Sequence, residues 1–183
     1  MIKNDTWIKE MAQNKGLIDP FASSQIRDGK ISFGLSSFGY DFRVADEFWI
    51  PRPVKQSDAI DPKSLRDDRF ETIRTKVCLV QPASYVMAKS LEYFRMPREI
   101  LGLCTGKSTY ARCGLLVNIT PLEPEWEGHL TFSILNPTPL PIRVYAEEGI
   151  AQVIFLEGSS PETSYADRKG KYQAQKGITL PKL

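Results

Sequence analysis

Beyond its first fifteen residues, the chain alternates short apolar runs with turn residues, as expected for strands. The predicted strands cover residues 40–43, 47–50, 77–80, 85–91, 100–104, 115–119, 129–135, 142–145 and 150–155. Prolines fall mostly between these runs, and proline marks turns and sheet edges because it cannot donate a ladder hydrogen bond. The pattern therefore predicts a mostly β sandwich or barrel.

Two short helices interrupt the β pattern. At the N-terminus, Asp5 or Thr6 can cap a helix that Gly16 is expected to end. A second helix is predicted over 108–112, with Gly114 ending it in the left-handed conformation. Neither helix is long enough to change the mostly β assignment.

No repeat or linker divides the chain, so residues 1–183 are expected to form one domain. Residues 158–183 differ from the rest because they are rich in Ser, Lys, Gln and Gly. Two interpretations stay open for them: a frayed tail, or a lid that orders over an anionic ligand. The side chains that would serve such a lid are Arg168, Lys169, Lys171, Lys176, Tyr165 and Tyr172.

Composition narrows the possible partners. The 183 residues are 42% hydrophobic and carry a net charge of +2, which fits a compact domain and excludes a generic polyanion binder. We therefore expect no nucleic-acid partner, and any phosphate recognition must be local. The apolar runs are shorter than the ~20 residues of a membrane helix, and the N-terminus lacks an apolar signal core. We expect no membrane association and a cytoplasmic location.

Cysteine and histidine usage bears on metal chemistry. The three cysteines form no CxxC pair, so reduced and partly buried thiols are expected. A zinc deaminase needs an H-x-E…P-C-x-x-C pattern, which this chain lacks. We therefore expect no zinc and no metal site made by side chains. His129 has no obvious partner and receives no catalytic role, whereas Trp126 is expected to anchor a hairpin by burial.

The segment 106–114, Gly-Lys-Ser-Thr-Tyr-Ala-Arg-Cys-Gly, carries the most chemistry. It imitates a P-loop, but only three residues separate Gly102 from Gly106 where the Walker pattern needs four. An ATPase is therefore rejected. A glycine, a lysine and two hydroxyls at the start of a helix still suit phosphate, and Arg112 lies one turn past Ser108. A capped helix with an ordinary surface cation is the alternative.

Motifs along nearly the whole chain form one set: residues 36–43, 92–97, 106–121, 123–129, 138–141, 145–152, 164–168 and 170–175. Together they resemble the dCTP deaminase family. The resemblance implies a dUTPase-like distorted β-barrel or β-clip, homotrimers with active sites between subunits, and a tail that closes over the nucleotide. It also implies conversion of dCTP and water to dUTP and ammonia, with Mg²⁺ bound through the triphosphate and inhibition by dTTP.

The resemblance also assigns site residues by position. The nucleotide-binding residues it implies are Lys107, Ser108, Thr109, Tyr110, Ala111, Arg112, Thr131, Phe132, Ser133, Gln152, Tyr165, Lys171 and Gln175. Within this set, Ser108 would help place the attacking water and Arg112 would stabilise charge around the pyrimidine. The backbone and side chains of 131–133 would read the edge of the base.

One departure from the family concerns catalysis. The family motif reads Thr-Leu-Glu-Phe-Ser-Asn, whereas residues 131–136 here read Thr-Phe-Ser-Ile-Leu-Asn, so the family's general acid/base glutamate falls on Ser133. A serine hydroxyl cannot act as a base near pH 7 without a basic partner, and losing such a group typically costs about 10²–10⁴-fold. Strand alternation still points Ser133 at the pocket. The nearby Glu123, Glu125 and Glu127 are expected to be exposed hairpin acids.

Three functions follow. The first is a zinc-independent dCTP deaminase in which Arg112, Ser108 and Ser133 lie at the reacting centre. The second is a catalytically silent protein that senses dCTP or dTTP and regulates an active paralogue through mixed trimers. The third is a dUTPase-like nucleotide pyrophosphohydrolase, for which the sequence offers no base aimed at a water that attacks phosphorus.

Overall fold

A computed structural model describes residues 1–53 and 59–183 of the chain. Its helices are α1 (Asp5–Lys15), the 3-10 helix η1 (Asp67–Arg69) and α2 (Ser108–Ala111). Its strands are β1 (Ile18–Asp19), β2 (Gly34–Ser36), β3 (Gly39–Pro51), β4 (Phe70–Arg74), β5 (Val77–Val80), β6 (Ser84–Arg95), β7 (Ile100–Gly106), β8 (Leu116–Asn118), β9 (Glu127–Asn136), β10 (Ile142–Tyr145) and β11 (Gly149–Glu157). The predicted mostly β architecture with an N-terminal helix is confirmed.

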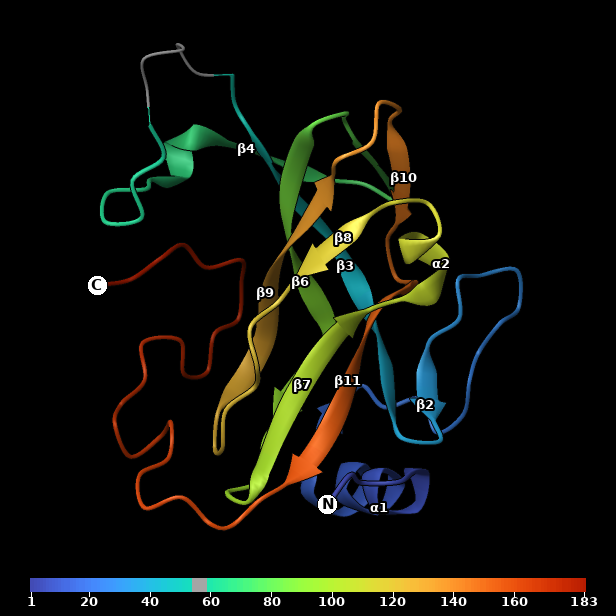
Figure 1. The fold of residues 1–183 in the computed structure, drawn as a ribbon, viewed down its shortest axis with the longest axis vertical. Coiled ribbons are helices and arrows are strands. Elements are labelled where there is room, and N and C mark those ends of the chain that lie inside the picture. Colours follow the sequence, from blue (N-terminus) through green and yellow to red (C-terminus); the bar gives the residue numbers. More distant parts are fainter. Residues whose placement is uncertain (54–58) are drawn as a thin grey trace.

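The strands form one large antiparallel sheet and a small one. The large sheet runs in the order β7-β11-β3-β6-β9-β8, with β1 added to β6 and both β2 and β4 added to β3. The small sheet pairs β10 with β5. Figure 1 shows α1 across one end of the long strands and the C-terminal tail running beside β9. The tail therefore lies next to the strand that carries Ser133.

Residue alternation along β9 separates the core from the site. Leu130, Phe132 and Ile134 are buried, whereas Thr131 and Ser133 between them are half-buried. The Phe132 ring packs edge-on against Phe42, with ring centroids 5.9 Å apart. The apolar residues thus face the core and leave the two hydroxyls on the opposite face.

Two expectations about the helices need correction. The N-cap of α1 is Asn4, whose Oδ1 accepts from Trp7 N at 3.1 Å, and not Asp5 or Thr6. Asn4 has extended backbone and directly precedes the helix, so its side chain is placed to cap the Trp7 N–H, while Asp5 Oδ1 accepts only from the adjacent Thr6, whose N lies at 2.8 Å. The second helix ends at Ala111, one residue before the predicted Arg112. Gly16 does end α1 in the left-handed conformation, as expected.

The strand predictions differ from the structure chiefly around β3. Runs 40–43 and 47–50 belong to one strand, whose pairing with β6 shifts register between Val44 and Phe48. This irregularity breaks the hydrophobic alternation that the prediction used, which made one strand look like two. β2 and β4 were missed because both are short additions to β3 with little apolar patterning of their own.

The three cysteines are free, as expected. Burial raises the pKa of the Cys78 thiol to about 11 and that of Cys104 to about 12, so both stay protonated at neutral pH. Separately, the helices in the described part of the chain are too short or too polar to cross a membrane.

Candidate active site

A cavity of about 750 Å³ lies between β9, the loop 118–126 and the C-terminal tail. Its volume is within the usual range for small-molecule sites, ~300–1,000 Å³. Its wall includes both hydroxyl residues of β9 together with three aromatic side chains and an amide: Thr131, Ser133, Trp126, Tyr165, Tyr172 and Gln175. The expected residues of β9 and of the tail therefore do meet around one cavity.

The tail runs along β9 and is hydrogen-bonded to it. His129 N donates to Gln175 O at 3.0 Å, and Gln175 Nε2 donates back to His129 O at 2.6 Å. Thr179 N donates to the hydroxyl of Thr131 at 3.1 Å, and the indole of Trp126 donates to Tyr172 O at 2.9 Å. The tail thus forms one wall of the cavity through backbone and side-chain hydrogen bonds. Burial of Trp126, as expected, accompanies this contact.

Ser133 offers an uncommitted hydroxyl to the cavity. It is half-buried, pairs in register with Met87 of β6 and Asn118 of β8, and its Oγ has no hydrogen-bonding partner among the described residues. The hydroxyl of Thr131, by contrast, is already bonded to the tail. A free hydroxyl can donate one hydrogen bond and accept others, but it cannot serve as a general base near neutral pH.

Carboxylates are scarce at this cavity. Counting only residues that the structure describes, Glu123 is the one carboxylate on its wall, and it is ion-paired with Arg168 of the tail. Groups of three or more His, Cys, Asp or Glu side chains that could hold a metal ion are likewise absent from the described residues. The one wall carboxylate among the described residues is thus already engaged by a cation.

The residues expected around α2 form a second group, centred on Asp41. Lys107 is buried and its Nζ lies 2.9 Å from Asp41 Oδ2. Gln152 Nε2 donates to Asp41 Oδ1 at 3.3 Å and to Ser36 Oγ at 3.1 Å. Lys107 and Gln152 therefore lie close together. Both side chains are bonded to Asp41, a buried acid of the same chain.

The remaining α2 residues divide into buried and exposed positions. Tyr110 is buried, and its hydroxyl accepts from Tyr145 N at 3.1 Å; burial raises its pKa to about 12. Ser108, Thr109, Ala111 and Arg112 are exposed. The guanidinium of Arg112 donates to Ser108 O at 3.0 Å, which confirms that the two residues share one face.

Within one chain, α2 and the tail-covered cavity are separate. Figure 1 places α2 and the tail on opposite sides of β6 and β9. The cavity wall contains Thr131, Phe132, Ser133, Tyr165 and Gln175, but none of 107–112 and not Gln152. Lys171, which was expected to bind nucleotide, donates to Lys182 O within the tail. Within the described residues of one chain, the two groups therefore do not line the same cavity.

His129 has partners that the sequence did not reveal. Its Nδ1 lies 3.1 Å from Ser90 O, and its ring packs edge-on against Tyr93 with centroids 5.3 Å apart. The expectation of a histidine without partners is therefore wrong, because both partners belong to β6 and only strand pairing brings them close. Burial, followed by the charge of Lys89, lowers the pKa of His129 below its usual value.

This lowered pKa predicts a pH effect on stability. Since the unfolded chain binds a proton more readily than the folded chain, the free energy of unfolding should fall as pH drops below 6.5, down to the folded-state pKa. His129→Asn should flatten the curve in that window. Urea unfolding of both proteins between pH 5 and 7 measures this, and an identical dependence of stability on pH in the two proteins would contradict a lowered pKa of the half-buried His129.

The protein is an antiparallel β-fold with a cavity lined by hydroxyl and aromatic groups and covered by the C-terminal tail. Such a cavity is typical of proteins that bind a small ligand. The comparisons with known proteins give the family. Residues 2–158 match the family model described as dCTP deaminase-like, and the chain belongs to this family.

Close relatives extend the likeness over the whole chain. A dCTP deaminase of Acidiphilium cryptum is 56% identical over 180 residues, which is 98% of this chain and 97% of the relative. A dCTP deaminase of Herpetosiphon aurantiacus is 54% identical over 183 residues, 100% of this chain and 99% of the relative. Among solved structures, 2'-deoxycytidine 5'-triphosphate deaminase from Agrobacterium tumefaciens has a TM-score of 0.65 at 14% identity. The match covers 86% of this chain and 48% of the Agrobacterium chain. Because the sequence identity is so low, this likeness supports the fold alone.

Proposed function

We propose that this protein deaminates dCTP: water adds at C4 of the base, ammonia leaves, and dUTP is the product. The support is the full-length identity of 54–56% to proteins named dCTP deaminase. The observation that carries the proposal in this chain is the cavity of about 750 Å³ that the tail closes against β9. Its aromatic walls suit a pyrimidine, and its hydroxyls suit the polar edge of the base. We place this reaction in the cytoplasm, with the other steps of deoxynucleotide metabolism.

We further propose that the protein works as a homotrimer whose sites are shared between neighbours. The separation of the cavity from α2 supports this, because the exposed Ser108, Thr109 and Arg112 then serve the cavity of an adjacent subunit. Exposed leucines on two strands, Leu103 of β7 and Leu116 of β8, also favour burial against another copy.

In this arrangement the triphosphate would lie at the start of α2. The hydroxyls of Ser108 and Thr109 are free to meet phosphate, while Lys107 holds the segment to the sheet through Asp41. Mg²⁺ would enter with the triphosphate, bound by its phosphate oxygens.

Ser133 favours a second candidate function. A pocket without a general base can still bind nucleotide, and a hydroxyl accepts the 4-amino group of dCTP or donates to the 4-oxo group of dUTP and dTTP. The second candidate is therefore a regulator that binds these nucleotides and turns over slowly or not at all. The free Oγ of Ser133 in the cavity is the observation in its favour.

One assay separates these functions. Purified protein is incubated with dCTP and Mg²⁺, and ammonia, dUTP and pyrophosphate are measured beside calorimetric binding. Ammonia and dUTP in equal amounts support the deaminase; binding without product supports the regulator. Pyrophosphate release would instead support a hydrolase of the phosphate chain, and absence of binding by any deoxypyrimidine triphosphate would overturn the assignment.

The tail gives a prediction of its own. A chain truncated before Tyr165 should bind dCTP more weakly, because Tyr165, Tyr172 and Gln175 form one wall of the cavity. Losing one base-stacking aromatic residue alone costs roughly 1–3 kcal/mol in comparable sites, so we expect at least about a fivefold rise in Kd. Calorimetry with dCTP measures this, and an unchanged Kd would mean that the tail is not part of the nucleotide site.

A further inference from the structure

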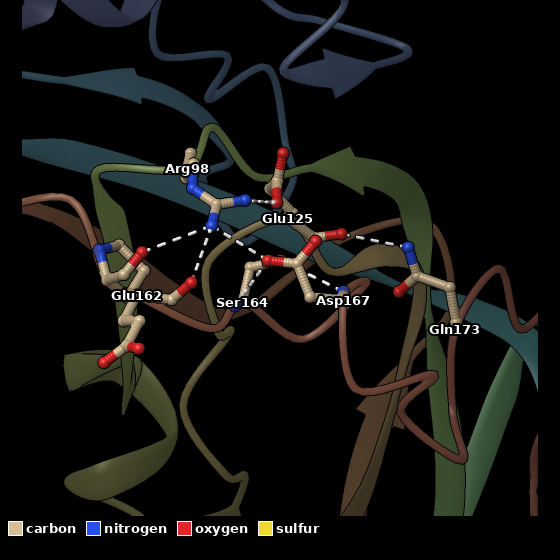
Figure 2. Close-up of polar contacts among 7 residues, drawn as sticks. Arg98, Glu125, Glu162, Ser164, Asp167 and Gln173 are labelled. Atoms are coloured by element: carbon tan, nitrogen blue, oxygen red, sulfur yellow. Dashed lines mark hydrogen bonds and ion pairs between the residues drawn. The ribbon is translucent and has the colours of Figure 1, made fainter.

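Arg98 joins three segments of the chain that are remote in sequence. It lies in the turn between β6 and β7, beside the 123–126 hairpin and the first part of the tail (Figure 2). Its Nη1 donates to Glu125 Oε2 at 2.7 Å. Its Nη2 donates to Asp167 Oδ2 at 2.8 Å and to two tail carbonyls, Glu162 O at 3.1 Å and Pro161 O at 3.2 Å. One guanidinium thus holds a hairpin and a tail segment to the same turn.

The tail segment that Arg98 holds is itself a closed turn. Asp167 Oδ2 also accepts from Ser164 N at 3.0 Å, and Asp167 N donates to Ser164 Oγ at 3.2 Å. Ser164 is only 2% exposed, so this turn is packed against the protein. The Ser164 N–H, followed by Arg98, holds the pKa of Asp167 below its usual value, so Asp167 remains a charged partner at neutral pH.

Tyr165 connects this turn to the cavity. Its backbone N–H donates to Pro124 O at 3.0 Å, and its hydroxyl accepts from Tyr172 N at 2.9 Å. Tyr165 and Tyr172 line the cavity, whereas Arg98, Glu125 and Asp167 do not. Arg98 therefore sits behind the wall and can influence a bound ligand only through the residues it holds.

Backbone strain is present both in the hairpin that Arg98 contacts and in the tail. Glu125 has φ of 60°, and in the tail Lys169 and Ala174 have φ of 52° and 55°. Side-chain-bearing residues occupy this left-handed region at a cost in free energy and keep it where surrounding contacts enforce it. Two of these contacts hold Glu125: Arg98 donates to the Glu125 carboxylate, and Gln173 Nε2 donates to the Glu125 backbone carbonyl at 2.9 Å.

We propose that Arg98 is a positioning residue for the nucleotide site: by clamping Glu125 and the 161–167 turn, it holds Tyr165 and Tyr172 in the cavity wall before nucleotide arrives. This role of Arg98 rests on the proposed function in one respect only, which is that the ligand is dCTP. Without the clamp the tail spends much of its time open, and a nucleotide must restore the closed conformation on binding. Apparent affinity then falls in proportion to the closed fraction.

The test uses full-length Arg98→Gln and dCTP with Mg²⁺. We expect Kd and KM to rise about tenfold, the result of a closed population reduced to roughly one tenth, with kcat much less affected. In the absence of nucleotide, trypsin should cleave the tail at its lysines and arginines faster than in the wild type. Asp167→Asn should have a similar but smaller effect, and the double variant should be little worse than Arg98→Gln alone.

Controls separate positioning from folding and from the identity of the ligand. Arg74→Gln removes another surface arginine–carboxylate pair, with Glu47, remote from the tail, and should leave Kd and cleavage unchanged. Arg98→Lys, which keeps the charge but not the forked geometry, should fall between wild type and Arg98→Gln. Unchanged tail cleavage and unchanged Kd in Arg98→Gln would overturn the proposal, as would additive effects with Asp167→Asn. If the tail of Arg98→Gln is cleaved faster but the wild type binds no dCTP, the result supports the clamp and refutes dCTP as the ligand.

Discussion

Ser133→Glu is expected to raise the rate of dCTP deamination by about 10²–10⁴-fold, the usual contribution of a positioned general acid/base. Ser133 lies on the face of β9 that opens into the cavity, whose volume of about 750 Å³ can accept one more methylene and a carboxylate in place of the hydroxyl. Partial burial would raise the pKa of that carboxyl, which suits a group that accepts a proton from water and later delivers one to the leaving amine.

Two variants control this experiment. Ser133→Gln has nearly the same shape as the glutamate variant but cannot take up a proton, so it should show no gain. Thr131→Glu puts a carboxylate on the same face two residues away, where the side chain meets the tail at Gly177 and Thr179, and should also show no gain. Equal rates for Ser133→Glu and the wild type, with dCTP still bound, would mean that more of the catalytic arrangement than this carboxylate has changed.

Local patterning explains what could be predicted of the fold. The expected bounds of β5 and β10 agree with the structure because each is a short apolar run bounded by turn residues or proline. The face of β9 that carries Ser133 also followed from alternation alone. Short strands that exist only as additions to β3 have no such signal, since their stability comes from pairing with a remote partner.

Contacts remote in sequence were beyond the same reasoning. The Arg98–Asp167 bond joins residues 69 apart, and the Lys107–Asp41 pair joins residues 66 apart. Lys107 is predicted as a phosphate ligand because a lysine after glycine at a helix start is typical of one, and this stays a prediction. Only the folded sheet shows that Asp41 of β3 lies beside the Lys107 ammonium group. Removing one partner of a buried ion pair strongly destabilises the folded protein, because the other charge is left unpaired.

The proposed sharing of sites between subunits has a direct consequence for mixed trimers. The double variant Arg112→Ala/Ser133→Glu should be nearly inactive, because removing a group that stabilises developing charge costs about 10²–10³-fold. The wild type keeps Arg112 but lacks the carboxylate. Co-expression of the two with different affinity tags, followed by purification through both tags, isolates trimers that contain both kinds of subunit.

Each such trimer holds one interface at which α2 with Arg112 comes from a wild-type subunit and the cavity with the new glutamate from the variant. About one third of the sites should therefore work at the rate of the Ser133→Glu homotrimer, as cyclic head-to-tail contacts require. A site built within one chain cannot gain both groups by mixing, so the mixed trimers would then show only the average of the two parents. The first result is favoured because none of residues 107–112 lines the cavity and Figure 1 shows α2 and the tail on opposite sides of β6 and β9.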